Sequence, residues 1–179
     1  MPRIGNIILL SIIVFSTTAF AQANLERIQS SCGPSAQQFD VHNSNQKTPL
    51  TADSSKAQVI VVEKFDRKAG EMARPTLRIG VDGSWVGATR DNSYLAFLVE
   101  PGEHHMCVQW QSSFSGVNQI AAFTQMTAEP GKTYYFMAQV KYPPKSGGSK
   151  MRLSFDAVDQ SQGEYLVNTN PVSNPKPKH

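Results

Sequence analysis

The segment that decides the fold is Leu77-Arg-Ile-Gly-Val-Asp-Gly-Ser-Trp-Val-Gly87. In its first half, apolar side chains alternate with arginine and glycine, as they do in a strand with one buried face. The Asp-Gly pair that follows is the strongest two-residue signal for a β-hairpin. The segment therefore predicts two antiparallel strands joined by a tight turn.

The hairpin also predicts which residues face each other across it. With a two-residue turn, the expected pairs are Val81–Ser84, Gly80–Trp85 and Ile79–Val86. The last pair belongs to the core face of the sheet. Trp85 then lies on the opposite face, diagonal to Arg78.

Two interpretations of Trp85 follow. In the first, its ring covers the side-chain-free Gly80 and packs on Arg78. In the second, the ring is a stacking platform for a ligand such as a sugar, with Arg78 and Phe114 as further contacts beside the loops at 112–117 and 143–149. We favour the first, because single aromatic residues on a protein surface are ordinary.

Strand patterns continue on both sides of the hairpin. The run Val59-Ile-Val-Val62 is apolar on both faces, as in a central strand of a packed sheet. The nearly unbroken period-two alternation predicts an all-β fold, an antiparallel β-sandwich of about seven to eight strands. The further strands are expected at 94–99, 104–111, 119–127, 133–142 and 150–158, with a short edge strand at 39–41.

The two ends of the chain are predicted to differ from this domain. Residues 22–56 are expected to form an arm, mostly loop, and residues 57–158 the β-sandwich. Residues 159–168 predict a short helix, and the proline- and lysine-rich stretch 169–179 predicts a loose tail.

The first 21 residues have the three parts of a secretory signal. A charged start containing Arg3 precedes the apolar run at 7–15, and Ala19-Phe-Ala21 provides small residues for a cut before Gln22. The apolar run is shorter than the roughly 20 residues that a membrane-spanning helix needs. We expect an exported chain, periplasmic or extracellular, with no membrane span after the signal is removed.

The chain has two cysteines, Cys32 and Cys107. In an exported protein they favour one disulfide, which would tie the arm to the domain. A competing interpretation uses His105, which shares a strand face with Cys107: a thiolate beside an imidazole is a nucleophile or half a metal site. We favour the disulfide because a partner cysteine exists and the expected compartment oxidises thiols.

Composition and motifs give little support to catalysis. The net charge of +3 is small and scattered, so no nucleic-acid partner is expected. No Gly-x-Ser-x-Gly elbow is present, and the neighbouring His104 and His105 point to opposite faces of a strand, so they do not form a ligand pair. We expect no catalytic residues, no metal and no cofactor.

Three turn motifs resemble a known family when taken with the hairpin segment. They are Leu98-Val-Glu-Pro-Gly-Glu-His104, Pro130-Gly-Lys-Thr-Tyr-Tyr-Phe136 and Val158-Asp-Gln-Ser-Gln-Gly-Glu164. Over residues 57–167 the chain is similar to a PEGA-related family of exported bacterial β-sandwich domains of unknown function, many of them lipoproteins. The resemblance implies an Ig-like or PEGA-like sandwich in the envelope or outside the cell, without catalytic residues. This chain lacks the lipid-attachment cysteine of the lipoprotein members.

Three functions are compatible with these features. The first is a non-catalytic binding or scaffolding domain of the bacterial cell envelope, with a glycan or a protein as partner. The second is a subunit of an envelope assembly, joined by strand addition at an exposed sheet edge. The third is a thiol-dependent enzyme that uses Cys107 and His105.

Overall fold

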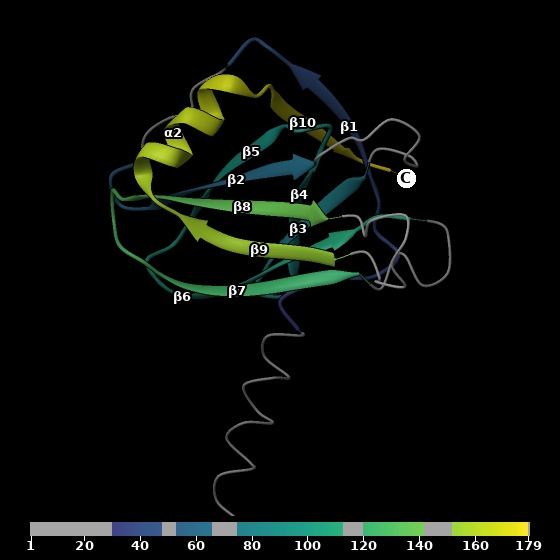
Figure 1. The fold of residues 1–179 in the computed structure, drawn as a ribbon. Helices are drawn as coiled ribbons and strands as arrows, with labels where there is room; N and C mark the ends of the chain where they lie inside the picture. Colours follow the sequence, from purple (N-terminus) through teal and green to yellow (C-terminus); the bar gives the residue numbers. More distant parts are fainter. Residues whose placement is uncertain (1–29, 48–52, 66–74, 113–119, 142–151, 179) are drawn as a thin grey trace, which may run out of the picture.

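The computed structural model describes residues 30–47, 53–65, 75–112, 120–141 and 152–178. Over these ranges the chain forms ten strands and one short helix, so the predicted all-β class is confirmed (Figure 1). The predicted signal peptide, with its cleavage site between Ala21 and Gln22, lies outside the described residues. So does Phe114.

The strands divide between two sheets. The six-stranded sheet has the order β1-β10-β5-β2-β8-β9, and the four-stranded sheet has the order β4-β3-β6-β7. The eight strands predicted within 57–158 and the edge strand predicted at 39–41 are all found. The bounds are β1 Phe39–Ser44, β2 Ala57–Phe65, β3 Thr76–Val81, β4 Ser84–Arg90, β5 Tyr94–Val99, β6 Gly102–Trp110, β7 Ala121–Ala128, β8 Thr133–Lys141, β9 Arg152–Val158, α2 Gln160–Thr169 and β10 Val172–Pro177.

The predicted sandwich of about seven to eight strands lacks β10, and its purely antiparallel pairing is wrong at two places. Ten strands lie in the described ranges; β10 pairs with β5 in parallel at one residue pair, and β2 runs parallel to β8 over eight residue pairs, from Gln58–Thr133 to Phe65–Val140. Side chains alternate between faces in parallel and antiparallel strands alike, so the sequence pattern does not reveal strand direction. The connection from β2 to β8 is long enough for a parallel pairing, because the whole four-stranded sheet lies within it.

The main apolar core lies between the two sheets. Val59 and Val61 of β2 contribute side chains without exposed surface, and Ile79 of β3 does the same from the facing sheet. Phe136 of β8 and Phe155 of β9 add a tilted ring contact with centroids 5.5 Å apart. Each fully buried aliphatic or aromatic side chain stabilises the fold by roughly 1.5–3 kcal/mol. The two sheets are therefore held together by apolar burial.

A second, smaller core lies on the other face of the six-stranded sheet. Ile60 and Val62 of β2 point there and are buried together with Tyr94 and with Leu166 of α2. Figure 1 shows α2 lying across this face. The Asp159 side chain caps the helix, accepting a hydrogen bond of 2.9 Å from a backbone N–H of its first turn. This confirms both the C-terminal helix and the central strand that is apolar on both faces.

The prediction of a loose tail is wrong, because β10 forms a strand next to β1. Ser173 is buried, and its hydroxyl shares a hydrogen bond of 2.5 Å with that of Ser93. Pro175 and Pro177 suggested a loose end, but in a strand the N–H groups of alternate residues point to the same edge. Lys178 N–H donates to Gln38 O at 2.8 Å, so the N–H groups of alternate residues counted from Lys178 face β1. Pro175 and Pro177 fall on the other edge of β10, and the pairing with β1 keeps its donors.

Candidate functional site

The β3–β4 hairpin brings Trp85 to the face of the four-stranded sheet that points away from the main core. The predicted pairs Val81–Ser84 and Gly80–Trp85 are found. The predicted pair Ile79–Val86 is wrong: Ile79 pairs with Gly87, because a β-bulge lies between the two registers. Val86 is the extra residue of the bulge and is 38% exposed, so it does not belong to the core face.

A segment without regular secondary structure, residues 31–38, lies on this outer face; we call it the arm segment. It turns at Pro34, whose carbonyl accepts a hydrogen bond of 3.3 Å from Gln37 N–H. The predicted disulfide is present: Cys32 is bonded to Cys107 of β6, with Cα atoms 5.4 Å apart, and Cys107 has no exposed surface. Gly80 of β3 lies next to both cysteines, and a Cβ added there would lie 2.8 Å from Ser31 O. The arm segment therefore covers Gly80, and the expectation that Trp85 covers it is wrong.

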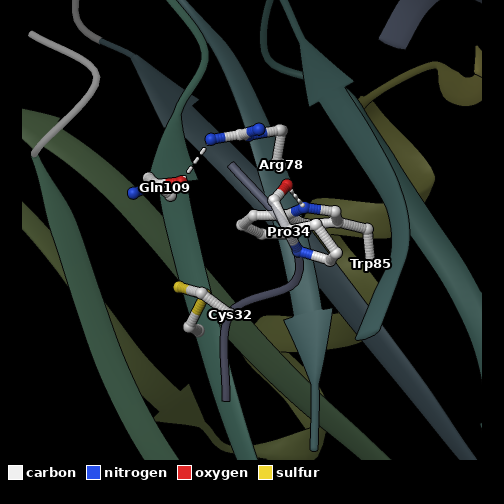
Figure 2. Close-up of a disulfide and its surroundings, with 6 residues drawn as sticks. Cys32, Pro34, Arg78, Trp85 and Gln109 are labelled. Atoms are coloured by element: carbon white, nitrogen blue, oxygen red, sulfur yellow. Dashed lines mark hydrogen bonds between the residues drawn. A yellow bond between two sulfur atoms is a disulfide. The ribbon is translucent and has the colours of Figure 1, made fainter. Parts of the chain in front are cut away.

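Trp85 binds the arm segment directly (Figure 2). Its indole Nε1–H donates to Pro34 O at 2.8 Å. Gly33 lies against the five-membered part of the ring, so that an added Cβ would be 2.5–2.7 Å from three ring atoms. The predicted packing of Arg78 on Trp85 is confirmed, with the guanidinium carbon 4.3 Å from the ring centroid. The ring is thus in contact with both the arm and Arg78.

Arg78 holds the next part of the arm segment. It is 3% exposed, and its Nη1 donates to Ser35 O at 3.0 Å and to Gln37 O at 2.6 Å, while Nη2 donates to the side chain of Gln109. Its Nε has no hydrogen-bond partner. Burial lowers the pKa of this guanidinium. The group still remains a cation, because an arginine is not deprotonated in proteins.

Gln111 holds the end of the arm, where it enters β1. Its side-chain Oε1 accepts from Phe39 N–H at 2.7 Å, and its Nε2 donates to Phe39 O at 2.8 Å. At the other end, Gly83 N–H donates to Ser31 O at 3.2 Å. From Ser31 to Phe39, the hydrogen bonds described here reach backbone atoms of the arm, and the Cys32 side chain adds the disulfide.

The side chains of the arm take little part in this binding. Pro34, Ser35, Ala36 and Gln38 are exposed. The features that the face requires are a residue without a side chain opposite Trp85, which Gly33 supplies, and a cysteine opposite Cys107. The site is complementary to a peptide backbone that has a Cys-Gly step followed by a turn at 34–37.

Comparison with family models, curated proteins and solved structures gives no match to this chain. These comparisons therefore assign no family to the chain. The site must be interpreted from its own geometry.

The residues of the proposed thiol centre are engaged elsewhere. Cys107 is bonded to Cys32, and His105 lies 3.5 Å from a carboxylate oxygen of Glu103. His104 binds Asp82 at 2.6 Å through Nδ1 and Glu100 O at 2.7 Å through Nε2. Within the described ranges, no three His, Cys, Asp or Glu side chains gather as a metal ion would need.

The pKa of His104 reflects a balance of opposing effects. Burial alone would lower it, but the hydrogen bonds to Glu100 O and to the Asp82 carboxylate favour the protonated ring and raise the pKa. The same Asp82 accepts from His105 N–H at 2.9 Å through its other oxygen. This cluster fixes the β3–β4 turn against the start of β6.

A buried carboxyl group in the core was not predicted. Glu63 of β2 has no exposed surface, and neither of its carboxyl oxygens has a hydrogen-bond partner. The hydroxyl of Thr89 is close enough to lower the pKa of Glu63 but is itself buried without hydrogen-bonding geometry. Burial raises the pKa of Glu63 to about 8, with Asp91 acting in the same direction and Arg90 against it. Glu63 is therefore largely protonated at neutral pH.

Sequence reasoning found Trp85, Arg78 and both cysteines, but not the residues that complete the arm contacts. Gly33, Pro34, Gln109 and Gln111 were missed, because backbone carbonyls carry no sequence signature. Glu63 had a signal: positions 59, 61, 63 and 65 share one strand face, and a glutamate in that series is a charge pointing at the core. As for membrane insertion, the described part of the chain holds no helix with the length and apolar character of a span.

Proposed function

We propose that this protein is a non-catalytic, exported β-sandwich domain of the Ig-like or PEGA-like type, which acts by binding or scaffolding in the bacterial cell envelope. The observation that carries the proposal is the Cys32–Cys107 disulfide, which clamps the arm segment onto a sheet face and in which Cys107 is buried. Disulfides form and persist in oxidising compartments. This supports export, in line with the signal sequence.

The contacts of the outer face support a binding role. Three long polar side chains of the outer face and its rim, those of Arg78, Trp85 and Gln111, bind backbone groups of a separate segment. Such contacts do not depend on the side chains of the bound segment. A protein segment fits this face better than a glycan, because the arm and Arg78 already lie on the Trp85 ring.

The thiol-enzyme alternative has less support. Cys107 has no thiolate while its sulfur is bonded to Cys32, and a thiolate is the nucleophilic form of cysteine. Activity of this kind would need prior reduction and removal of the arm. Counting thiols in denatured, unreduced protein separates the alternatives: the scaffold proposal expects none.

Strand addition is the second candidate function, and β7 favours it. β7 is an edge strand of the four-stranded sheet and pairs with β6 alone within the described residues. Phe123 on it is 36% exposed. An exposed edge presents unpaired backbone groups to a strand from another protein. β9 lies near part of this edge, so an added strand would displace that contact.

Two measurements test the proposed function. The full chain is produced with its own leader in a bacterium, and the exported fraction is analysed for an N-terminus at Gln22 and for a mass two hydrogens below the reduced value. A photo-crosslinking amino acid is then placed at the exposed Ser35 and, as a matched control, at the exposed Tyr165 on α2. A full-length chain with two thiols in the cytoplasm would refute export.

The crosslinks decide between the binding roles. Reaction with a defined envelope protein at Ser35 but not at Tyr165 supports binding at the outer face, and reaction with glycan strands at Ser35 supports the glycan partner. A crosslinker at Phe123 reports on strand addition at β7. If all three positions react equally or none reacts, a specific binding role is refuted.

A further inference from the structure

The outer face of the four-stranded sheet resembles a peptide-binding site whose ligand belongs to the same chain. The arm segment is far in sequence from everything it touches: Arg78 is 43 residues from Ser35, and Trp85 is 51 residues from Pro34. Within the described contacts, backbone hydrogen bonds and one disulfide hold it there. A segment held in this way is removable in principle without unpacking the main core.

The strand after the arm is attached in a similar manner. β1 is an edge strand of the six-stranded sheet and, among the residues that the structure describes, pairs with β10 alone. Its Asp40 forms an ion pair of 3.0 Å with Lys178, and its Asn43 side chain donates to Arg90 O at 2.7 Å. Phe39, at its start, is the buried apolar anchor. Residues 31–44 therefore form a docked N-terminal unit.

We propose that the outer face binds the N-terminal unit of a second copy of this chain, and that thiol–disulfide exchange at Cys32–Cys107 controls the replacement. The inference rests on the binding role proposed above for this face. The occupant is chosen by complementarity: the face needs a Cys-Gly step and the turned backbone of residues 34–37, and a second copy presents the same segment. When two copies exchange their N-terminal units reciprocally, every contact of the unit is made again between the copies. The single copy and the exchanged pair therefore differ mainly in how the chain connects the unit to its site and in their dependence on protein concentration.

The exchange step balances without an outside oxidant. A dithiol reductant first opens the disulfide in one copy by giving it two electrons and two protons, and itself becomes a cyclic disulfide. The Cys32 thiolate of that copy then attacks the Cys107 sulfur of a second, oxidised copy. The bond between the copies forms, the Cys32–Cys107 bond within the second copy breaks, and the released Cys32 thiolate takes up the proton lost by the attacking thiol. The reciprocal bond, between this Cys32 and Cys107 of the first copy, closes when the cyclic disulfide takes back two electrons and two protons and becomes the dithiol again.

Isotope mixing tests this directly on the unmodified protein. Chains labelled with ¹⁴N and ¹⁵N are mixed under native conditions with a small amount of dithiothreitol, quenched with an alkylating agent and digested, and the disulfide-linked peptides are weighed. We expect mixed heavy–light Cys32–Cys107 pairs, increasing with protein concentration. They should exceed mixed Cys32–Cys32 and Cys107–Cys107 pairs at least about tenfold, because docking directs the reaction.

Two outcomes would overturn the inference. Heavy–light Cys32–Cys107 pairs that stay absent mean that the arm returns only to its own chain. Heavy–light pairs of all three types in their statistical ratio, with Cys32–Cys107 only about twice each of the others, mean random thiol oxidation.

A variant pair gives a second measurement. Cys32→Ser and Cys107→Ser cannot close the disulfide alone, but together with oxidised glutathione they should form a disulfide-linked heterodimer. As a control, Cys32→Ser is mixed with the triple variant Cys32→Ser/Cys107→Ser/Ala36→Cys, whose arm thiol points to solvent. That mixture should remain at background, and equal yields would count against docking. Failure here leaves the Ser35 crosslinks, and hence the envelope-binding proposal, independently testable.

Discussion

Gly33 and Trp85 lie in direct contact, with the backbone of the first against the indole of the second. A methyl group at position 33 would be 2.5 Å from the nearest ring atom, closer than side chains approach one another. The ring cannot easily move away from this group, because its Nε1–H is bound to Pro34 O and Arg78 lies over it. This contact makes the arm a fitted ligand of the sheet.

The first prediction follows from that contact. Gly33→Ala should lower the free energy of unfolding by about 1–3 kcal/mol, the usual cost of an added group in a packed site. The urea midpoint, followed by tryptophan emission, measures it. Ser35→Ala is the matched control: its side chain is exposed, so a change within about 0.5 kcal/mol is expected. Equal midpoints for both variants would show that the arm does not press on Trp85.

The disulfide provides the second prediction. It joins residues 75 apart in sequence, and the chain-entropy argument gives it about 4 kcal/mol of stabilisation. Reduction should lower the urea midpoint by a corresponding amount and shift the emission of Trp85 to longer wavelength as the arm leaves. In Cys32→Ala/Cys107→Ala the reductant should have no effect. A reduced protein as stable as the oxidised one would contradict the role of the clamp.

Arg78 yields a third prediction, because its fork of donors reaches two carbonyls of the arm and Gln109. A lysine keeps the charge but cannot make the same set of bonds. Arg78→Lys should therefore cost about 2 kcal/mol, in the range for a hydrogen bond to a charged group. Denaturant titration measures it, with Arg152→Lys on the exposed face of β9 as control. The idea is wrong if both replacements cost the same.

The fourth prediction concerns pH and Glu63. Its pKa is raised from 4.5 to about 8 by burial, so between these values the folded state holds a proton that the unfolded state has lost. The contribution of Glu63 to stability should be greatest below pH 4.5, fall as the pH rises to about 8 and then level off, by about 1.4 kcal/mol for each unit of the shift. Unfolding titrations from pH 4 to 9 measure this slope. Glu63→Gln should flatten it.

Two further variants separate Glu63 from its neighbours. The pKa of His104 is also raised, so stability from this group is lost as the pH rises above 6.5. The slope that remains in Glu63→Gln should therefore decrease further in the double variant Glu63→Gln/His104→Gln. Thr89→Val removes a buried hydroxyl without a partner and the group that lowers the pKa of Glu63. It should stabilise the protein at low pH and steepen the loss at high pH. A slope unchanged by Glu63→Gln would refute the assignment.

The sequence predicted what depends on local alternation and on simple pairing of cysteines. The hairpin at Asp82, the two-faced strand at 59–62 and the Cys32–Cys107 bond belong to this group. The bulge at Val86 was not predictable in the same way: it depends on Gly87, whose φ of 157° and close approach to Leu95 become meaningful only once the strands are paired.

The missed features share a non-local origin. The parallel pairing of β2 with β8 has the same alternation as an antiparallel one. The contacts of the arm use carbonyl groups, which every residue has. Glu63 was missed because the apolar run was ended at Val62, although the next residues continue the strand through Phe65. In each case, only the folded chain shows which groups meet.

The last prediction concerns β10, the strand that composition placed in a loose tail. A chain ending at Asn170 loses the β1–β10 pairs, the Ser173–Ser93 bond and the hydrogen bond from Tyr94 N–H to Pro171 O. Cross-strand pairs contribute roughly 0.2–1 kcal/mol each, so the truncation should cost about 3 kcal/mol or more. β1 then has no partner strand, and proteolysis should cut near the arm first. A chain ending at Pro177 keeps these contacts and should melt within a few degrees of the full chain, whereas equal melting of the Asn170 truncation would mean that β10 does not hold β1 in place.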